Sequence, residues 1–484
     1  MGLFKLPRRQ YLGLLAASAT VGLLSACSHG TNQLAQAATA TAGGAKGTPQ
    51  SAASPAGTPV KAATPKPTAT PGVLPVPMPT GATKLTIWFH WGGKQGDEVQ
   101  SLINKYNTTQ GKTDKLYVSI QTVDPSTYLE KMTAAKIAGD TPDVYSNSVP
   151  AKILGTNQIA IPFPTEESQY VQKNYIAGSV ELVTFKGQVW GFPTEYQAPA
   201  YLYRKSLFQK AGIESPPKSI DDEYQDAVKL TVKSGGKTTL YGYTLWYDNY
   251  PITQLASLIA RFGGQMYSFE GERPVKVDVV SQQAVEAVKW WQSLVTAGAT
   301  QVAQMPYTDA WSNGLAATTE IEVWFPIFYL RDGGREDIWN DLGGQAVQPK
   351  SGVNPIVYAG GWQLSVANGS KNVDHTWPFL HWMMYKPDMP FSHFIVEQIG
   401  AIPSPTDYPK NIPGWSDAVT QAYLVDTAPI SRGNPERLVL GAPQIDKAVE
   451  DMMQAIFLGK EQLESGLQKL NTQLNGIIKR TDTA

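Results

Sequence analysis

Residues 84–93 read KLTIWFHWGG, and this stretch decides where the fold begins and to which class it belongs. Lys84–Phe89 is rich in β-branched and aromatic residues, which predicts a strand. The glycine-containing segment His90–Gly96 predicts a turn. We expect Asp97 to cap a helix, because apolar residues recur after it at helical spacing, at Val99, Leu102, Ile103 and Tyr106. A strand, a turn and a helix follow one another, as in an α/β protein.

The same alternation continues downstream. Leu116–Val123 predicts a second strand, Pro125–Ala138 a helix that ends at Gly139, and Pro142–Tyr145 a short third strand. Strands that alternate with helices favour a parallel sheet. Further predicted elements are a hairpin over 185–192 with its turn at Lys186–Gly187, helices capped by Ser219 and Ser281, a strand over Tyr241–Trp246, and helices over roughly 443–457 and 461–479. About 400 ordered residues exceed what one core usually holds, so we expect two lobes.

A segment of different composition precedes the fold. Residues 28–82 consist mostly of Ala, Thr, Pro, Gly, Ser and Gln. Such a segment buries too little apolar surface to offset its ordering entropy, and its prolines favour extended structure. We therefore expect a disordered tether over 27–82 and no packed structure before about residue 83.

The N-terminus has the layout of an export signal. A basic start with Lys5, Arg8 and Arg9 precedes an apolar run, Tyr11–Ala26, and then Cys27, the only cysteine of the chain. Leu24–Cys27 resembles the lipobox of bacterial lipoproteins. The resemblance implies that residues 1–26 are removed and that Cys27 carries a lipid which anchors the chain to the outer face of the cell membrane. The alternative is an uncleaved anchor, for which the run is short. The paired arginines also resemble a twin-arginine signal, so the export route stays open.

Charge and cysteine content exclude several classes. The formal net charge is −1, and it becomes −4 when residues 1–26, with three basic and no acidic residues, are removed. Such a chain is a poor nucleic-acid binder. One cysteine excludes an intramolecular disulfide and a multi-cysteine metal site.

Six segments follow one another in a recognisable order: Leu85–Gly93, Tyr128–Val144, Phe185–Pro193, Leu202–Gly212, Gly360–Trp362 and Gly459–Ile478. Taken together, they resemble bacterial extracellular solute-binding proteins of the sugar type, the family 1 or maltose-binding-protein-like receptors of ATP-driven (ABC) importers. The chain departs from the family's pattern at two places: Arg204 replaces a usual Asn, and Thr319–Phe325 lacks the glycine common there.

The resemblance implies an α/β, two-lobe periplasmic-binding-protein fold of type II, with the ligand cleft between lobes joined by hinge crossings. The implied N-terminal lobe comprises residues 83–196 and 358–404, and the C-terminal lobe residues 197–357 and 405–484. The implied partners are a mono- or oligosaccharide and a membrane permease. We expect a monomer without a cofactor, metal or catalytic residue.

A sugar site needs flat aromatic platforms and hydrogen-bonding side chains, at the carboxyl ends of strands or at the crossings. On this basis, and on the family's pattern, the candidate ligand-binding residues are His90, Trp91, Asn147, Glu195, Tyr196, Trp246, Asp248, Trp324, Gly361 and Trp362. Glu322, beside Trp324, is a further candidate acceptor of hydroxyl hydrogens.

Two alternatives remain open. The same receptor fold could bind a polyamine, a glycerol-phosphate or another polar metabolite; a polyamine needs several carboxylates in the cleft, whereas the predicted cleft has few charges. Alternatively, Glu195 and Glu322 could form the acid pair of a surface glycan hydrolase. No nucleotide-binding or serine-hydrolase motif appears in a suitable context.

Overall fold

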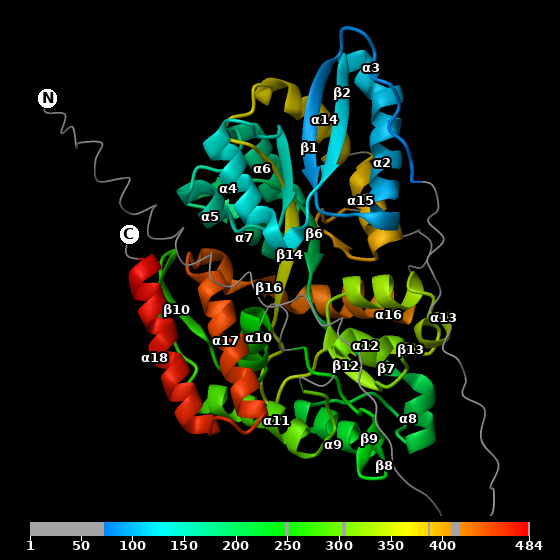
Figure 1. Ribbon diagram of the computed structural model, residues 1–484, viewed down its shortest axis with the longest axis vertical. Coiled ribbons are helices and arrows are strands. Elements are labelled where there is room, and N and C mark those ends of the chain that lie inside the picture. The colour runs from blue at the N-terminus through cyan, green and yellow to red at the C-terminus, as the bar shows by residue number, and fades with distance from the viewer. Residues whose placement is uncertain (1–71, 247–250, 303–305, 386–387, 408–416, 483–484) are drawn as a thin grey trace, which may run out of the picture. The chain divides into compact units, whose positions relative to one another are not determined.

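The computed structural model describes residues 72–246, 251–302, 306–385, 388–407 and 417–482 (Figure 1). All of them belong to one compact unit. The expected leader, the lipid-modified Cys27 and most of the expected tether lie outside the described residues. Asp248 also lies outside them.

The first lobe is built on a mixed sheet in the order β15-β6-β14-β3-β1-β2, with β16 also paired to β14. β1 is parallel to β2 and β3, whereas β14 runs antiparallel to β3 and β6. The predicted parallel strands therefore form one half of the sheet, and a long antiparallel strand joins them to the other half. The strands are β1 (Thr83–Phe89), β2 (Leu116–Thr122), β3 (Val144–Asn147), β6 (Phe192–Gln197), β14 (Val357–Val366), β15 (Ile402–Pro403) and β16 (Ser431–Gly433).

Helices cover this sheet, and α2 follows β1 directly, as the sequence predicts (Figure 1). The helices of this lobe are α2 (Gly93–Thr108), α3 (Gln110–Asp114), η1 (Pro125–Thr127), α4 (Tyr128–Ala138), α5 (Ala151–Thr156), α6 (Thr165–Asn174), α7 (Ala177–Val183), α14 (Val373–Met384), α15 (Pro390–Phe394) and the π-helical η3 (Ile395–Ile399). A hairpin of β4 (Thr184–Phe185) and β5 (Gln188–Val189) turns at Lys186 and Gly187, both at positive φ, as the Lys-Gly pair predicts.

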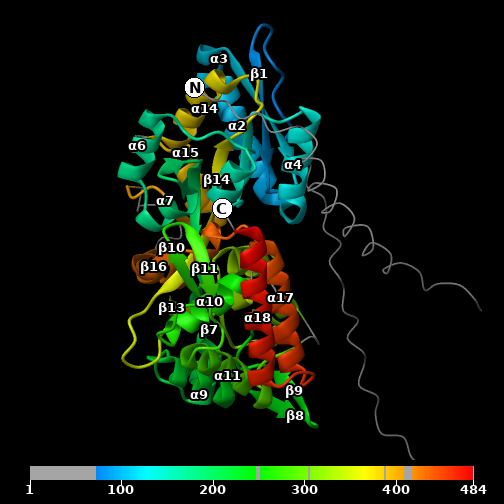
Figure 2. The same cartoon turned by 90° about the vertical axis from the view of Figure 1, so that its left-hand side faces the viewer.

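The second lobe contains a smaller sheet in the order β12-β7-β13, in which both neighbours run antiparallel to β7. Figure 2 shows α17 and α18 side by side in this lobe. Its strands are β7 (Ala200–Arg204), β8 (Val232–Ser234), β9 (Lys237–Leu240), β10 (Tyr267–Glu270), β11 (Arg273–Val277), β12 (Thr318–Ile321) and β13 (Leu342–Ala346). Its helices are α8 (Lys205–Ala211), α9 (Ile220–Leu230), α10 (Pro251–Arg261), α11 (Gln282–Thr296), α12 (Tyr307–Ser312), η2 (Pro326–Arg331), α13 (Glu336–Trp339), α16 (Ala418–Gln421), η4 (Ala422–Thr427), η5 (Ala428–Ile430), η6 (Pro435–Leu438), α17 (Ala442–Phe457) and α18 (Leu463–Thr481).

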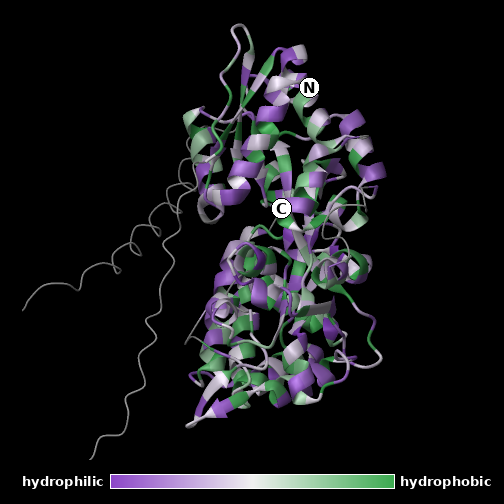
Figure 3. Cartoon of the chain, turned by 90° about the vertical axis from the view of Figure 1, so that its right-hand side faces the viewer, coloured by the Kyte–Doolittle hydropathy of each residue, from purple (hydrophilic) through white to green (hydrophobic). Residues whose placement is uncertain are grey.

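Local sequence signals explain several element ends. The Ser219 and Ser281 hydroxyls accept hydrogen bonds from the backbone N–H groups of Asp222 and Ala284 and cap α9 and α11, as predicted. Gly139 ends α4 at a φ of 71°, where a side chain would be strained. The helices of both lobes carry hydrophilic and hydrophobic bands, which places their apolar faces against the sheets (Figure 3).

Three expectations differ from the structure. Asp97 does not cap α2, which begins four residues earlier at Gly93; its carboxylate instead accepts a hydrogen bond from the backbone N–H of Val73. The strand expected over Tyr241–Trp246 is reduced to isolated bridges at Tyr241 and Thr244. Packed structure starts before residue 83. The Val76 amide donates a hydrogen bond to the side chain of Asn104, and the Val76 carbonyl accepts one from the Tyr117 hydroxyl.

A buried arginine holds the second lobe together. Arg261, at the end of α10, pairs with Glu223 of α9 at 2.6 Å and with Glu320 of β12, and it donates to the Gln348 carbonyl. Its side chain is 1% exposed, so these acceptors must replace the water that it loses. One guanidinium therefore fixes the positions of two helices, a strand and the segment after β13.

We expect Arg261→Met to lower the free energy of unfolding by about 3–5 kcal/mol, because it leaves two carboxylates in the interior without their cation. Arg273→Met is the matched control, since Arg273 pairs with Glu270 at the surface and such pairs contribute about 0–1 kcal/mol. Urea unfolding monitored by circular dichroism measures both. Equal losses in the two variants would contradict the role given to Arg261.

Candidate ligand-binding site

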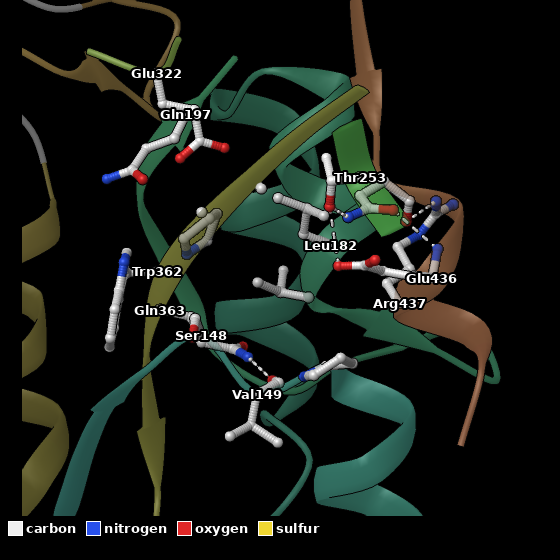
Figure 4. Close-up of a pocket in the computed structure, with 16 residues that line it drawn as sticks. Ser148, Val149, Leu182, Gln197, Thr253, Glu322, Trp362, Gln363, Glu436 and Arg437 are labelled. Atoms are coloured by element: carbon white, nitrogen blue, oxygen red, sulfur yellow. Dashed lines mark hydrogen bonds between the residues drawn. The ribbon is translucent and has the colours of Figure 1, made fainter. Parts of the chain in front are cut away.

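A cavity with about 720 Å³ of atom-free space, part of it open to solvent, lies beside the strands β6 and β14 (Figure 4). Elements of both lobes line it. Its polar lining comprises Ser148, Gln197, Thr253, Glu322, Gln363, Asn434, Glu436 and Arg437, and its other lining residues are Val149, Pro150, Leu182, Val183, Pro193, Gly360, Gly361 and Trp362.

Trp362 supplies the aromatic surface of the cavity and is held from one side by His90. The two rings stack with centroids 3.4 Å apart and planes 9° apart. His90 Nδ1 is 3.0 Å from the Ser146 hydroxyl, and burial lowers the pKa of its imidazole well below 6.5. His90 is therefore neutral at pH 7, and its position is that of a support behind Trp362.

Trp91 and Asn147 lie deeper than the cavity wall. Trp91 is 8% exposed and packs edge-on against Phe394, with ring centroids 5.1 Å apart. Asn147 is fully buried at the end of β3, where its carboxamide accepts from the Val149 amide and donates to the Ser365 hydroxyl. Both predicted residues shape the region behind Trp362, and neither lines the cavity.

Glu195 and Tyr196 lie within β6, opposite Trp362 and Gly361 of β14. The Glu195 carboxylate is fully buried and accepts hydrogen bonds from Thr194 and Gln197. Burial raises its pKa to about 8, and the bond from Thr194 only partly opposes this shift. Tyr196 points its phenol toward Gly178 of α7, where an added Cβ would lie 2.2 Å from the hydroxyl, and so away from the cavity lining.

The second lobe brings three predicted residues together. The indole N–H of Trp324 donates to Glu322 at 2.9 Å, and Trp324 also meets Trp246 edge-to-face with centroids 5.9 Å apart. Glu322 is 5% exposed and lines the cavity; burial raises its pKa to about 7, against the effect of the indole bond. Trp324 thus orients the Glu322 carboxylate at the cavity wall, and Trp246 packs against Trp324.

Sequence reasoning missed one wall of the cavity. Asn434, Glu436 and Arg437 come from η6 and the residue before it, and Thr253 comes from α10. Thr253 donates to Glu436 and accepts from Asn434. The only local signal is the turn-forming Asn-Pro pair, which predicts a helix start but no site. The fold brings these residues to the cavity, although most of the other lining residues are far from them in the sequence.

Two general features bear on the class of site. In the described parts of the chain, His, Cys, Asp and Glu side chains nowhere gather in groups of three that could hold a metal ion. Among the described helices, none is long and apolar enough to cross a membrane.

Comparison with known proteins gives the class. The family model for bacterial extracellular solute-binding proteins matches residues 115–386, more than half of the chain. The chain therefore belongs to this family of exported binding proteins, as the sequence resemblance predicts. A binding protein of Brucella abortus (strain 2308) is 23% identical over 366 residues, which cover 73% of this chain and 83% of that protein. A binding protein of Brucella suis biovar 1 (strain 1330) matches equally.

Solved structures share the fold. The GacH receptor of Streptomyces glaucescens, studied unliganded and with acarbose, superposes with a TM-score of 0.68 at 19% identity, covering 83% of this chain and 99% of that one. The cyclic α-maltosyl-1,6-maltose binding protein of Arthrobacter globiformis gives 0.67 at 18% identity, covering 83% and 100%. The sugar-binding protein MalE of Xanthomonas citri gives 0.66 at 17% identity, covering 82% and 98%. The expected α/β, two-lobe periplasmic-binding-protein fold is confirmed.

The buried Glu195 makes stability depend on pH. Its pKa of about 8 in the folded protein lies above the ordinary value of 4.5, so the folded state holds the proton more tightly. The stability that this proton contributes is complete below pH 4.5 and is lost as pH rises from 4.5 through 8, by at most about 1.4 kcal/mol per pH unit. We expect Glu195→Gln to make the decline between pH 7 and 8 shallower by about 1 kcal/mol per pH unit, measured by urea unfolding. An unchanged slope would show that Glu195 is ionised in the fold.

Proposed function

We propose that this protein is the carbohydrate-binding receptor of an ABC importer. The observation that carries the proposal is Trp362 in the lining of a cavity in which eight of the sixteen lining residues are polar. A sugar presents weakly apolar ring faces and many hydroxyls, and this combination of a flat aromatic and several donors and acceptors matches it. The carbohydrate ligands named for the structural neighbours support the same ligand class.

Capture occurs by closure of the lobes around the ligand. Trp362 and Gln363 come from the first lobe, and Glu322 and Thr253 come from the second, so one ligand in the cavity touches both. A ligand that contacts both lobes stabilises the closed arrangement. We propose that the closed form delivers the sugar to the permease. The lobe boundaries after residues 196, 357 and 404 and the monomeric state belong to the same proposal.

The protein performs no chemistry in this proposal. A glycosidase needs two carboxyl groups on either side of the scissile bond. Of the pair considered, Glu322 lines the cavity, but Glu195 does not, and its oxygens are engaged by Thr194 and Gln197. Product analysis after incubation with glycans tests this point, because turnover would contradict a receptor.

We expect Trp362→Ala to weaken sugar binding by about 2 kcal/mol or more, roughly 30-fold in Kd, because it removes the stacking surface. A thermal-shift screen of mono- and oligosaccharides identifies the ligand first, since a ligand of the native state raises its Tm. Isothermal titration calorimetry then gives Kd. Trp382→Ala is the control, because Trp382 is a half-buried tryptophan of α14 outside this cavity. Equal affinity in the Trp362 variant and the wild type would remove Trp362 from the site.

We also propose that Cys27 carries the lipid that anchors the exported protein to the outer face of the membrane. The sequence layout of residues 1–27 supports the proposal. We expect Cys27→Ser to move most of the protein from the membrane fraction into the soluble fraction, because it removes the attachment atom. Fractionation and mass spectrometry of the N-terminus measure the effect. Retention of the variant in the membrane would indicate an uncleaved anchor instead.

A further inference from the structure

Two carboxylates in the cavity lack a cation. Glu322 accepts one hydrogen bond, from Trp324 to Oε2, and its Oε1 receives none from the described residues. Glu436 accepts from Thr253 through Oε1, while its Oε2 is buried without a hydrogen-bond partner in the described chain. In Figure 4 the two groups lie at different ends of the cavity, with Leu182 and Trp362 also on its walls.

Arg437 is the one cation in the cavity lining, and it pairs with neither carboxylate, although its Nε is buried without a hydrogen-bond partner in the described chain. Arg437 donates through Nη1 to the carbonyls of Gly433 and Asn434, and its Nη2 is 3.5 Å from Glu181, outside the lining. Among the described ion pairs, none includes Glu322 or Glu436, and Arg437 follows Glu436 in sequence without pairing with it. The cavity therefore has more acidic groups than its own basic group neutralises.

Neighbouring carboxylates add to this excess of acidic groups. Burial and the carboxylate of Asp446 raise the pKa of Glu436 well above its ordinary value, and the charge of Glu322 adds to the effect. The two carboxylates therefore sense each other electrostatically. The other titratable groups near them are Tyr267 beside Glu436 and Tyr423 beside Glu322, neither of which supplies a positive charge. Buried carboxylates are normally paired with cations, and here a ligand can supply the cation.

We propose that the preferred ligand is a carbohydrate that carries a protonated amine, which Glu322 binds as its missing cation. This inference rests on the proposed function and specifies its ligand class. The sugar ring contacts Trp362, and the ammonium donates to Glu322 at its end of the cavity, where Oε1 receives no hydrogen bond from the described residues. A neutral sugar offers only hydroxyl donors, which interact with a carboxylate less strongly than a charged group does.

Proton release distinguishes an amine from a neutral ligand. Burial raises the pKa of Glu322 to about 7 in the empty cavity, so a substantial part of it holds a proton at pH 7. An ammonium beside it favours the ionised form and lowers that pKa. Binding of the amino sugar therefore releases protons at pH 7, and its affinity rises with pH until the amine itself loses its proton.

The test compares three matched pairs of sugars by isothermal titration calorimetry on the purified full chain: glucose, galactose and mannose, each with its 2-amino-2-deoxy counterpart. We expect at least one amino sugar to bind 10-fold or more tightly than its neutral partner. We also expect a binding heat that depends on the ionisation enthalpy of the buffer, with the sign of proton release. Glu322→Gln should reduce the preference for the amine about 10-fold. Glu270→Gln, at an exposed site on β10, is the control and should keep it.

Each outcome separates this inference from the proposed function. Equal or tighter binding of the neutral sugars overturns the amine preference and leaves a carbohydrate receptor. Spermidine is included as a probe without a sugar ring, and its binding in place of every sugar overturns both conclusions. Since Glu322→Gln could unfold, its Tm is measured in parallel. Proton release by the wild-type protein decides the question without any variant.

Discussion

At Gly361 of β14, an added Cβ would stand 2.4 Å from the carbonyl oxygen of Glu195 in β6, and this close contact fixes how the two strands lie. The pairing register shifts just beyond it, between Trp362 and Gln363. Consecutive residues of a regular strand point to opposite faces, yet these two both line the cavity. The glycine and the shift together set how β14 lies against β6 where Trp362 and Gln363 enter the cavity lining.

Burial, more than direct charge pairing, sets the electrostatics of the site. His90, Glu195 and Glu322 are each 6% exposed or less, and in each burial is the largest cause of the pKa shift. Burial favours the neutral form of every one of them, so the imidazole loses its proton while the carboxyls tend to keep theirs. Around Arg261, by contrast, direct charge pairing dominates. There, two carboxylates surround one guanidinium, and the ion cluster serves the core of the second lobe.

Local signals predicted local structure well, because capping and turns depend on few residues. Ser219, Ser281 and the Lys186–Gly187 turn act within a span of four residues, and the structure places them as expected. Asp97 carries the same kind of signal, but it does not cap the helix. The helix already begins at Gly93, and the Asp97 carboxylate accepts a hydrogen bond from the backbone N–H of Val73 instead. The wall formed by residues 434–437 gives no comparable signal. These residues contact Thr253 only because distant elements pack together, and hydrophobic periodicity does not predict such packing.

Two ion pairs between the lobes differ in burial, and their difference matters for the proposed closure. Lys152 of α5 and Asp482 after α18 form a buried pair at 2.7 Å, and Lys152 also donates to the Leu438 carbonyl. Lys94 of α2 pairs with Asp332 after η2 at 3.1 Å, but its side chain is 60% exposed. Removing one partner of a buried pair costs about 3–5 kcal/mol, whereas an exposed pair contributes about 0–1 kcal/mol. Of these two contacts, the one at Lys94 is therefore the weaker, because water replaces the lost bond there. In the proposed closure of the lobes, a motion that keeps Lys152 paired costs less.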